Sequence, residues 1–292
     1  MSIIEKAVER VVAARKISHE HNIGETPPGD YDFRAFHNQR AAHERTPATV
    51  EPAVVLDNVR LRRHGIVAPH AHAARADDEF RRIKRPLLAN ATGKGSSLTE
   101  RGNLIMVSSA VAGEGKTHTA INLALNIARD LDHTVLLIDA DVIRRTTSVL
   151  LGIADKPGLV DLLHDDRVEL SRALLRTSMP RLTVLPAGMH HPQATELLSS
   201  QTMARLVTDM SSRYADRIII FDSPPLLVTV EAQVIAELAG QIVVVVEACR
   251  TPPAIVEEAI AMLDRSKPIG LVLNKSRRLL RTDYYGGYYK YQ

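Results

Sequence analysis

A glycine-rich stretch at residues 109–117 has the residue types and spacing of a loop that binds phosphate. It reads Ser-Ala-Val-Ala-Gly-Glu-Gly-Lys-Thr, follows an apolar run and precedes a helical pattern, which is the context that such a loop requires. Gly113 and Gly115 would let backbone N–H groups curl around phosphate oxygens, and the helix would add its positive end. Lys116 would reach the β- and γ-phosphates, and the Thr117 hydroxyl would bind Mg²⁺.

The strict pattern for this loop begins with a glycine, and Ala110 stands in its place, which is a modest departure. Because the surrounding strand and helix fit, we expect an ATP site here. The expected nucleotide contacts are Gly113, Glu114, Gly115, Lys116, Thr117, His118 and Asn274.

Three aspartates follow apolar runs that resemble strands. Asp139 and Asp141 come directly after residues 135–138, and Asp222 follows residues 217–221. Aspartates at such positions point toward the nucleotide in this type of fold, and Mg²⁺ prefers oxygen ligands. We therefore expect Thr117, Asp139 and Asp222 to bind the metal. The expected catalytic residues are Lys116, Asp139, Asp141 and Asp222, with Asp139 also able to polarise an incoming nucleophile.

Short runs of Ile, Val and Leu alternate with helical patterns and indicate how these residues are positioned. The runs predict strands near 104–108, 134–138, 182–185, 217–221, 241–247 and 269–273. Helices are predicted near 116–130, 201–213, 230–239 and 253–264. Alternation of this kind predicts an α/β fold of the P-loop NTPase type, a doubly wound, mostly parallel sheet with helices on both faces.

Composition excludes several classes of protein. The chain has 292 residues, of which 45% are apolar and 24% charged, an ordinary globular balance. Its longest apolar runs, 218–221 and 242–246, fall far short of the roughly 20 residues that span a bilayer. Glu5 and Glu9 stand where a signal peptide would be apolar. The single cysteine, Cys249, follows a predicted strand and is expected in the core, and one cysteine cannot form an internal disulfide. From these observations together we expect a cytoplasmic protein.

The end of the chain has an unusual composition. Five of the seven tyrosines lie in the last nine residues: Tyr284, Tyr285, Tyr288, Tyr289 and Tyr291. Five cations against one acid give residues 275–292 a net charge of +4. A cluster like this could be an enzyme's substrate, a sticky segment or a platform that stacks on nucleic acid. Residues 101–292 hold 21 basic and 21 acidic residues, which argues against a nucleic-acid partner.

The first third of the chain differs from the rest. Apolar residues at helical spacing predict an amphipathic helix within residues 1–23, and a partner protein, a membrane surface or its own domain could cover its apolar stripe. Residues 24–76 have the composition of a linker, largely flexible, with a short strand possible at 54–56. A helix is expected at 77–91, where Pro86 would kink or end it. We place the catalytic domain at 77–275 and the tyrosine-rich tail at 276–292.

These motifs together resemble the bacterial tyrosine kinase (BY-kinase) family. The resemblance rests on EGKTHTAINLAL, on LLIDADV with the following RR, and on IIIFDSPPLL, which correspond to Walker A, A′ and B motifs. Further runs make the resemblance more specific, to the tyrosine autokinases associated with exosortase and exopolysaccharide loci. These runs are MSIIEKAVERV, EFRRIKRPLLANA, LPAG, HPQATELLSS and VVVVEACRT. The resemblance covers most of residues 77–292 and the first helix.

The resemblance implies ATP-dependent autophosphorylation of the five tail tyrosines, with Lys116 and Thr117 in Walker A, Asp139 and Asp141 in Walker A′, and Asp222 in Walker B. It also implies a regulatory role in exopolysaccharide synthesis and export. Glu79, Arg82 and Arg85 match an E-x-x-R-x-x-R motif that assembles a ring of subunits, although such charges on one helical face are often merely solvated.

The resemblance further implies partners: a membrane-embedded polysaccharide chain-length determinant that activates the kinase, and a cognate tyrosine phosphatase. The chain would then lie at the inner face of the plasma membrane through its partner. Two other functions stay open on the residues alone. A partitioning-type P-loop ATPase would carry a signature lysine where this chain has Val111. A nucleotide-gated scaffold without catalysis would use the same binding residues.

Overall fold

The computed structural model describes residues 54–66, 74–95, 99–212 and 216–276. The predicted helix within residues 1–23, most of the predicted linker, and the five tail tyrosines lie outside these ranges. Within them, no helix is long and apolar enough to cross a membrane.

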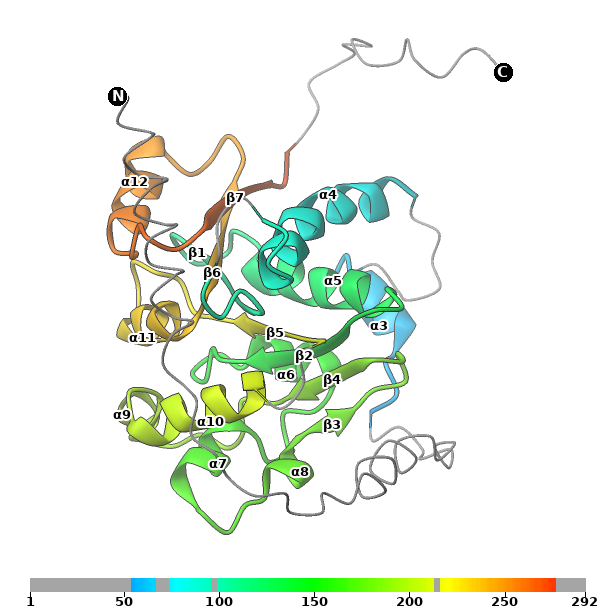
Figure 1. The fold of residues 1–292 in the computed structure, drawn as a ribbon, viewed down its shortest axis with the longest axis vertical. Coiled ribbons are helices and arrows are strands. Elements are labelled where there is room, and N and C mark those ends of the chain that lie inside the picture. The colour runs from blue at the N-terminus through cyan, green and yellow to red at the C-terminus, as the bar shows by residue number, and fades with distance from the viewer. Residues whose placement is uncertain (1–53, 67–73, 96–98, 213–215, 277–292) are drawn as a thin grey trace, which may run out of the picture. The chain divides into compact units, whose positions relative to one another are not determined.

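A seven-stranded sheet forms the centre of the described region (Figure 1). The strands are β1 (Leu104–Ser109), β2 (Thr134–Asp139), β3 (Leu175–Arg176), β4 (Leu182–Leu185), β5 (Arg217–Asp222), β6 (Gln241–Glu247) and β7 (Ile269–Asn274). Their order is β3-β4-β2-β5-β1-β6-β7, and all neighbours pair in parallel except β3 with β4. The doubly wound, mostly parallel sheet and all six predicted strands are confirmed, and only the two-residue β3 was not predicted.

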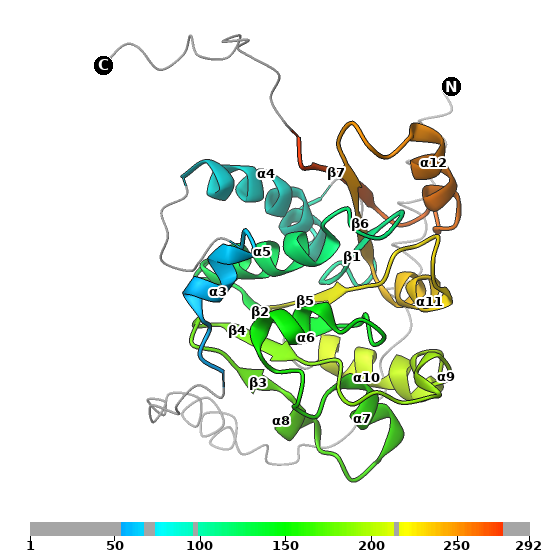
Figure 2. The same ribbon diagram turned by 180° about the vertical axis from the view of Figure 1, so that it is seen from behind.

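Helices cover both faces of the sheet (Figures 1 and 2). They are α3 (Asn58–Arg63), α4 (Ala74–Ala91), α5 (Lys116–Ala128), α6 (Thr146–Leu151), α7 (Leu159–His164), α8 (Leu170–Ala173), α9 (Ala194–Leu198), α10 (Gln201–Ser212), α11 (Val230–Leu238) and α12 (Pro253–Ala261). The four long helices expected after the phosphate loop are α5, α10, α11 and α12. The short helices α3 and α6 to α9 were not predicted.

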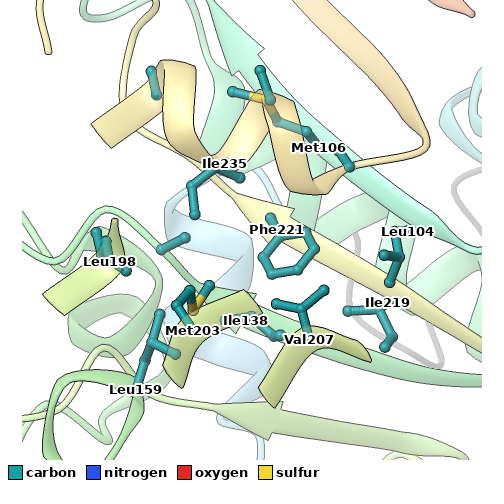
Figure 3. Close-up of a cluster of buried hydrophobic side chains, with 14 of the residues drawn as sticks. Leu104, Met106, Ile138, Leu159, Leu198, Met203, Val207, Ile219, Phe221 and Ile235 are labelled. Carbon is teal, nitrogen blue, oxygen red and sulfur yellow. The ribbon is translucent and has the colours of Figure 1, made fainter. Parts of the chain in front are cut away.

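Alternate residues of each strand enter two separate cores, as expected for a sheet that is buried on both faces. On one face Leu104 and Met106 of β1 join Phe221 of β5 and side chains from α7, α9, α10, α11 and α12 (Figure 3). On the other face Ile105 and Val107 join side chains from α3, α4 and α5. The two cores fix the strands from both sides and therefore fix the loops that leave their carboxyl ends.

Residues 54–66 pack against the sheet, although the sequence places them in the linker. Val54 forms a parallel bridge with Thr177, and the Leu56 N–H donates to Ser178 Oγ over 3.0 Å. The Asp57 side chain caps α3 by accepting from the N–H groups of residues 59 and 60. Four apolar side chains of this segment are buried: Val54, Leu56, Leu61 and Ile66. The packed region therefore begins before residue 77.

Two further details differ from the sequence-based expectation. Helix α4 continues through Pro86 to Ala91 instead of ending, because its apolar residues, among them Ile83 and Leu87, pack against α5 and the sheet. Cys249 is exposed and not in the core. It lies in the turn after β6 with a positive φ of 59°, so its side chain leaves the buried strand.

Candidate functional site

The phosphate loop joins β1 to α5 and has the backbone that its glycines predict. Gly113 has φ +90° and Gly115 has φ +102°, a region that residues with a Cβ rarely adopt. At Gly115 space is also limiting, since an added Cβ would overlap the Asn274 amide nitrogen. Gly115 is the N-cap of α5, and its carbonyl accepts the first helical hydrogen bond, from Thr119 N–H at 2.9 Å.

Glu114 holds the loop in shape with its side chain, which is only 1% exposed. Its carboxylate accepts from Val111 N–H at 2.8 Å within the loop and from Glu247 N–H at 3.2 Å at the end of β6. It also accepts from the Thr251 hydroxyl. The side chain thus faces the protein, and Glu114 is left to contact a nucleotide through its backbone.

The last described residues of the chain lie on the phosphate loop. Asn274, at the end of β7, donates from its amide to the Glu114 carbonyl over 2.8 Å. Lys275 donates to the Gly113 carbonyl over 2.6 Å and pairs with Glu247 at 2.9 Å. The hydrogen bond from Lys275 lowers the pKa of Glu247. Asn274 is therefore at the loop as expected, while Lys275 is a contact that the sequence reasoning missed.

His118 differs from its expected role in the arrangement of its ring. Its Nε2–H donates to the Gly65 carbonyl over 2.6 Å, which turns the imidazole toward the segment at 54–66. In this geometry the His118 ring therefore contacts Gly65 and does not face the phosphate loop. The residue instead joins the first turn of α5 to the segment that precedes α4.

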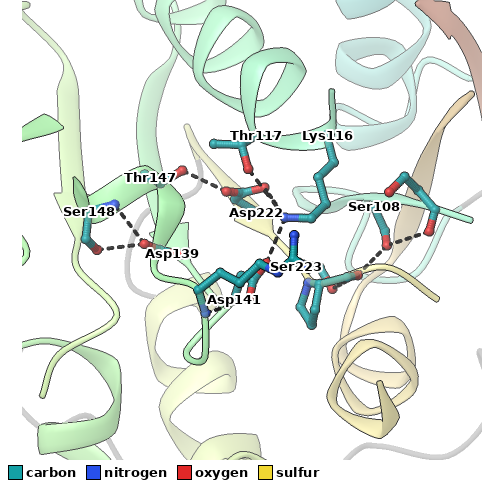
Figure 4. A network of polar contacts seen from close by, with 12 residues as sticks. Ser108, Lys116, Thr117, Asp139, Asp141, Thr147, Ser148, Asp222 and Ser223 are labelled. Carbon is teal, nitrogen blue, oxygen red and sulfur yellow. Dashed lines mark hydrogen bonds and ion pairs between the residues drawn. The ribbon is translucent and has the colours of Figure 1, made fainter. Parts of the chain in front are cut away.

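A buried lysine and three buried aspartates meet at the carboxyl ends of β2 and β5 (Figure 4). Lys116 Nζ donates to Asp141 Oδ2 over 2.8 Å and lies 3.9 Å from Asp222 Oδ1. Burial acts to lower the pKa of Lys116, but the Asp222 and Asp141 carboxylates outweigh it and leave that pKa raised. The lysine is therefore held charged.

Each of the two strand-end aspartates has one bonded and one unbonded oxygen. Asp139 Oδ2 accepts from both the backbone N–H and the hydroxyl of Ser148, each at 2.7 Å. Asp222 Oδ2 accepts from the Thr147 hydroxyl at 2.7 Å. Within the described ranges, Oδ1 of Asp139 and Oδ1 of Asp222 have no hydrogen-bond partner, and both residues are fully buried.

This crowding of carboxylates disfavours their charged forms. Burial, followed by the Asp222 carboxylate, raises the pKa of Asp139 to about 7, although the hydrogen bonds from Ser148 oppose the shift. Burial also raises the pKa of Asp222, with Lys116 and then Thr147 acting against it. A cluster with three carboxylates, one lysine and two buried oxygens without a hydrogen bond is suited to a divalent cation. The Thr117 hydroxyl lies 3.4 Å from Lys116 Nζ in the same cluster.

The residues expected to build an assembly lie away from this cluster. Glu79, Arg82 and Arg85 are all exposed and spaced three residues apart on α4. Their neighbours on the helix hold it in place: Asp77 pairs with Arg129 at 2.6 Å and Lys84 with Asp130 at 2.7 Å, both at the end of α5. The helix therefore presents the Glu-Arg-Arg set to the solvent while other charged residues fix its position.

Thr147 and Ser148 were missed because no local signal marks them. They lie in the first turn of the six-residue helix α6, which begins at Thr146, five residues after Asp141. A short helix lacks enough turns for a periodic pattern, so only the position of two hydroxyls after the Asp-x-Asp sequence could have pointed to them. The tail tyrosines lie outside the described residues, but the chain enters that segment from the phosphate loop.

Comparison with known proteins gives three consistent results. A family model described as an AAA domain matches residues 102–255. The tyrosine-protein kinase YwqD of Bacillus subtilis is 33% identical over 188 residues, which cover 63% of this chain and 76% of that protein. The tyrosine-protein kinase CpsD of Streptococcus agalactiae is 32% identical over 193 residues, 64% of this chain and 81% of that protein.

Solved structures have the same fold. The VpsO kinase domain is 28% identical, with a TM-score of 0.55 over 68% of this chain and 99% of that one. The chimerical protein CapA2B2 is 23% identical, with a TM-score of 0.61 over 78% of this chain and 96% of that one.

Proposed function

Because this chain belongs to the tyrosine-protein kinases of bacteria, within the AAA domain family, we propose that its substrate is the tyrosine cluster of its own C-terminal tail. One observation carries the proposal. Lys275, the residue before the tail, is bonded to the phosphate loop through the Gly113 carbonyl. Tyr284 follows nine residues later, so an extended tail reaches roughly 30 Å from the loop, enough for a site on the same chain or on a neighbouring copy.

The residues of the loop suit ATP as the phosphate donor. Backbone N–H groups around Gly113 and Gly115 would receive the phosphates, Lys116 would exchange its bond with Asp141 for phosphate oxygens, and Asn274 lies beside the loop. Thr117 and Asp222 would hold Mg²⁺, together with Asp139 in its unprotonated form. A bound Mg²⁺ neutralises charge that develops on the transferring phosphoryl group.

The transfer itself is a single displacement. A bond forms between the tyrosine Oη and the γ-phosphorus, while the bond between that phosphorus and the oxygen it shares with the β-phosphate breaks. ADP leaves, and the phenolic proton passes to a carboxylate of the aspartate cluster. We assign that transfer to Asp139, which ends β2 beside Asp222, because a positioned carboxylate can accept the proton of an attacking hydroxyl.

Labelled ATP and Mg²⁺ test the proposal in one set of reactions. Purified protein should incorporate label, whereas Lys116→Met should not, because the charge that meets the phosphates is gone. A variant with the five tail tyrosines changed to Phe should also lose the label while still binding ATP. Label that survives in the five-Phe variant would place the acceptor elsewhere, and ATP hydrolysis without labelled tyrosine would favour an ATPase.

Assembly and partners are a second part of the proposal. The exposed Glu79, Arg82 and Arg85 on α4 support contacts between copies in a ring, which would let one copy phosphorylate the tail of the next. Residues 1–23 are the proposed docking element for a membrane-embedded polysaccharide chain-length determinant. Through that partner the kinase would act at the inner face of the plasma membrane and regulate exopolysaccharide synthesis and export, with a cognate phosphatase resetting it.

Deletion of residues 1–23 separates the docking role from catalysis. The truncated chain should lose association with membranes that contain the partner and should keep its basal incorporation of label. Unchanged association after the deletion would refute the role of the first helix.

A further inference from the structure

Two neighbouring hydroxyls at the start of α6 each hold one buried aspartate of the site (Figure 4). Thr147 donates to Asp222 and Ser148 donates to Asp139, both over 2.7 Å. The two aspartates are themselves direct neighbours, because β2 and β5 pair with Asp139 opposite Asp222. One short helix therefore contacts both carboxylates that were expected to bind the metal.

These contacts decide which oxygen of each carboxylate remains available. In both aspartates Oδ2 is the bonded atom, and Oδ1 has no hydrogen-bond partner in the described part of the chain. The terminal torsion of an aspartate is broad and nearly two-fold, so a carboxylate without a donor can turn and exchange its oxygens. A hydroxyl bonded to Oδ2 restricts that rotation and leaves Oδ1 without a hydrogen bond, with the Lys116 ammonium 3.9 Å from Oδ1 of Asp222.

The helix that supplies the hydroxyls is itself fixed from several sides. Ser148 Oγ accepts from Ala187 N–H at 3.0 Å, in the loop after β4. The Arg60 guanidinium donates to the Val149 carbonyl over 2.6 Å, and the Arg145 guanidinium donates to the Ala154 carbonyl over 2.9 Å. Thr147 and Ser148 are almost fully buried. Their hydroxyls are thus held at fixed positions and are not free to follow a moving carboxylate.

We propose that Thr147 and Ser148 are positioning residues of the metal site, which orient the Oδ1 atoms of Asp222 and Asp139 for a divalent cation. The inference rests on the proposed function, because it presumes that these aspartates bind Mg²⁺. Residues that hydrogen-bond to metal ligands commonly determine metal affinity, and their loss weakens it by about 10- to 100-fold. A residue that served the fold alone would affect stability without this effect on the metal.

Calorimetric titration of Mg²⁺ into the protein saturated with ADP tests the proposal without any turnover. Thr147→Val keeps the size of the side chain and removes the hydroxyl, and it should raise the Mg²⁺ concentration for half-saturation by about 10- to 100-fold. Affinity for ADP in EDTA should not change. Thr147→Ser should restore wild-type Mg²⁺ binding, and Thr146→Val, a neighbouring hydroxyl on the same helix, should behave as the wild type.

Ser148→Ala is the second variant, and it keeps the bond from the backbone N–H to Asp139. It should weaken Mg²⁺ binding, as Thr147→Val should, and it therefore tests the inference even if Thr147→Val does not fold. Wild-type Mg²⁺ binding in Thr147→Val or, where that variant is unfolded, in Ser148→Ala would overturn the inference and leave the proposed function standing. An equal loss in Thr146→Val would also overturn it. If the wild-type protein itself shows no Mg²⁺ binding, the metal site of the proposed function fails, and the positioning role fails with it.

Discussion

The ionisable side chains that meet at the carboxyl ends of β2 and β5 are buried and closely spaced. One buried lysine faces three buried aspartates, and the lysine is already paired with Asp141 at 2.8 Å. Each of the other two aspartates keeps one oxygen without a hydrogen-bond partner within the described residues, and in Asp222 that oxygen lies 3.9 Å from Lys116 Nζ. An isolated charge in such surroundings costs several kcal/mol, so the arrangement is favourable only when a cation or protons balance it. Without a bound cation, the carboxylates of this cluster therefore repel one another, and a divalent cation or protons would reduce that repulsion.

Replacement of Asp139 tests that electrostatic repulsion. Burial raises the pKa of Asp139 in the folded state to about 7, so the folded protein binds a proton that the unfolded chain releases near pH 4. Stability should then fall as the pH rises from about 4 to about 7 and stay level above it. Asp139→Asn keeps acceptors for Ser148 and removes the charge, so it should increase the free energy of unfolding at pH 8 by on the order of 1–3 kcal/mol, and by much less at pH 4.

Urea unfolding of both proteins at the two pH values measures this difference. A stabilisation that is the same at pH 4 and pH 8 would show that charge at Asp139 is not its cause. Loss of label from ATP is expected in the same variant, because Asp139 also belongs to the proposed catalytic set.

Elements position these residues, and the sequence predicts the long ones far better than the short ones. The strands carrying Asp139 and Asp222 are continuous apolar runs, so their ends and the meeting of their aspartates could be predicted. Helix α6 has six residues and no periodic pattern, so Thr147 and Ser148 could not be assigned a contact. The hydrogen bond between Lys275 and Gly113 joins residues 162 positions apart, and no local pattern indicates it. Leu61 in α3 is buried, but its burial was not predicted because the residues around it have the composition of a linker.

Helix α4 offers a test at the scale of one element. The helix runs through Pro86, which is exposed and cannot donate to the helical ladder. Since tertiary packing of α4 holds the helix against that cost, Pro86→Ala should restore a hydrogen bond and increase the free energy of unfolding by about 1–3 kcal/mol. Urea denaturation measures it. A destabilised variant would indicate that the proline stabilises α4, for example by limiting the unfolded chain.

Strand β7 offers a second test of this kind, because the strand ends on the phosphate loop and leads toward the tail. Lys275→Gln removes an ammonium that is 44% exposed, so the effect on stability should be small. Phosphorylation of the attached tail should slow, since the residue that precedes the tail is no longer held at the loop. Phosphorylation of an added peptide with the sequence of residues 277–292 should slow much less. Arg265→Gln, an exposed charge in the loop before β7, is the matched control.

Phosphorylation rates of the attached tail and of the free peptide show whether Lys275 anchors the tail or acts on the phosphate loop. If Lys275→Gln slows the attached tail and the free peptide equally, Lys275 acts on the loop itself and does not anchor the tail.

At the scale of the whole molecule, charge links phosphorylation to assembly. The tail from residue 275 carries +4, and five phosphotyrosines would add about −7.5 to −10. We expect this reversal to expel the tail from a site that is rich in carboxylates and phosphate, and so to loosen the proposed ring. Native mass spectrometry should show larger assemblies after phosphatase treatment than after incubation with ATP. Identical distributions of oligomers would refute this link.

Charge reversals on the exposed face of α4 can be tested by the same native mass spectrometry of the assemblies. Arg82→Glu combined with Arg85→Glu should abolish the larger assemblies. Arg81→Glu on the same helix should not, because Arg81 belongs to a surface pair with Asp78 that contributes little. Assemblies that persist in the double variant would place the contact on another surface.

Phosphosite mapping by mass spectrometry identifies the acceptor residues and so tests whether the tail tyrosines are the substrate. After incubation with ATP and Mg²⁺, phosphate should appear on tyrosines within residues 284–291 and be absent from Tyr31 and Tyr214, the two tyrosines outside the tail. The Lys116→Met protein should carry none. Phosphate on Tyr31 or Tyr214 at comparable occupancy, or an unmodified tail in a protein that consumes ATP, would show that the tail is not the specific substrate.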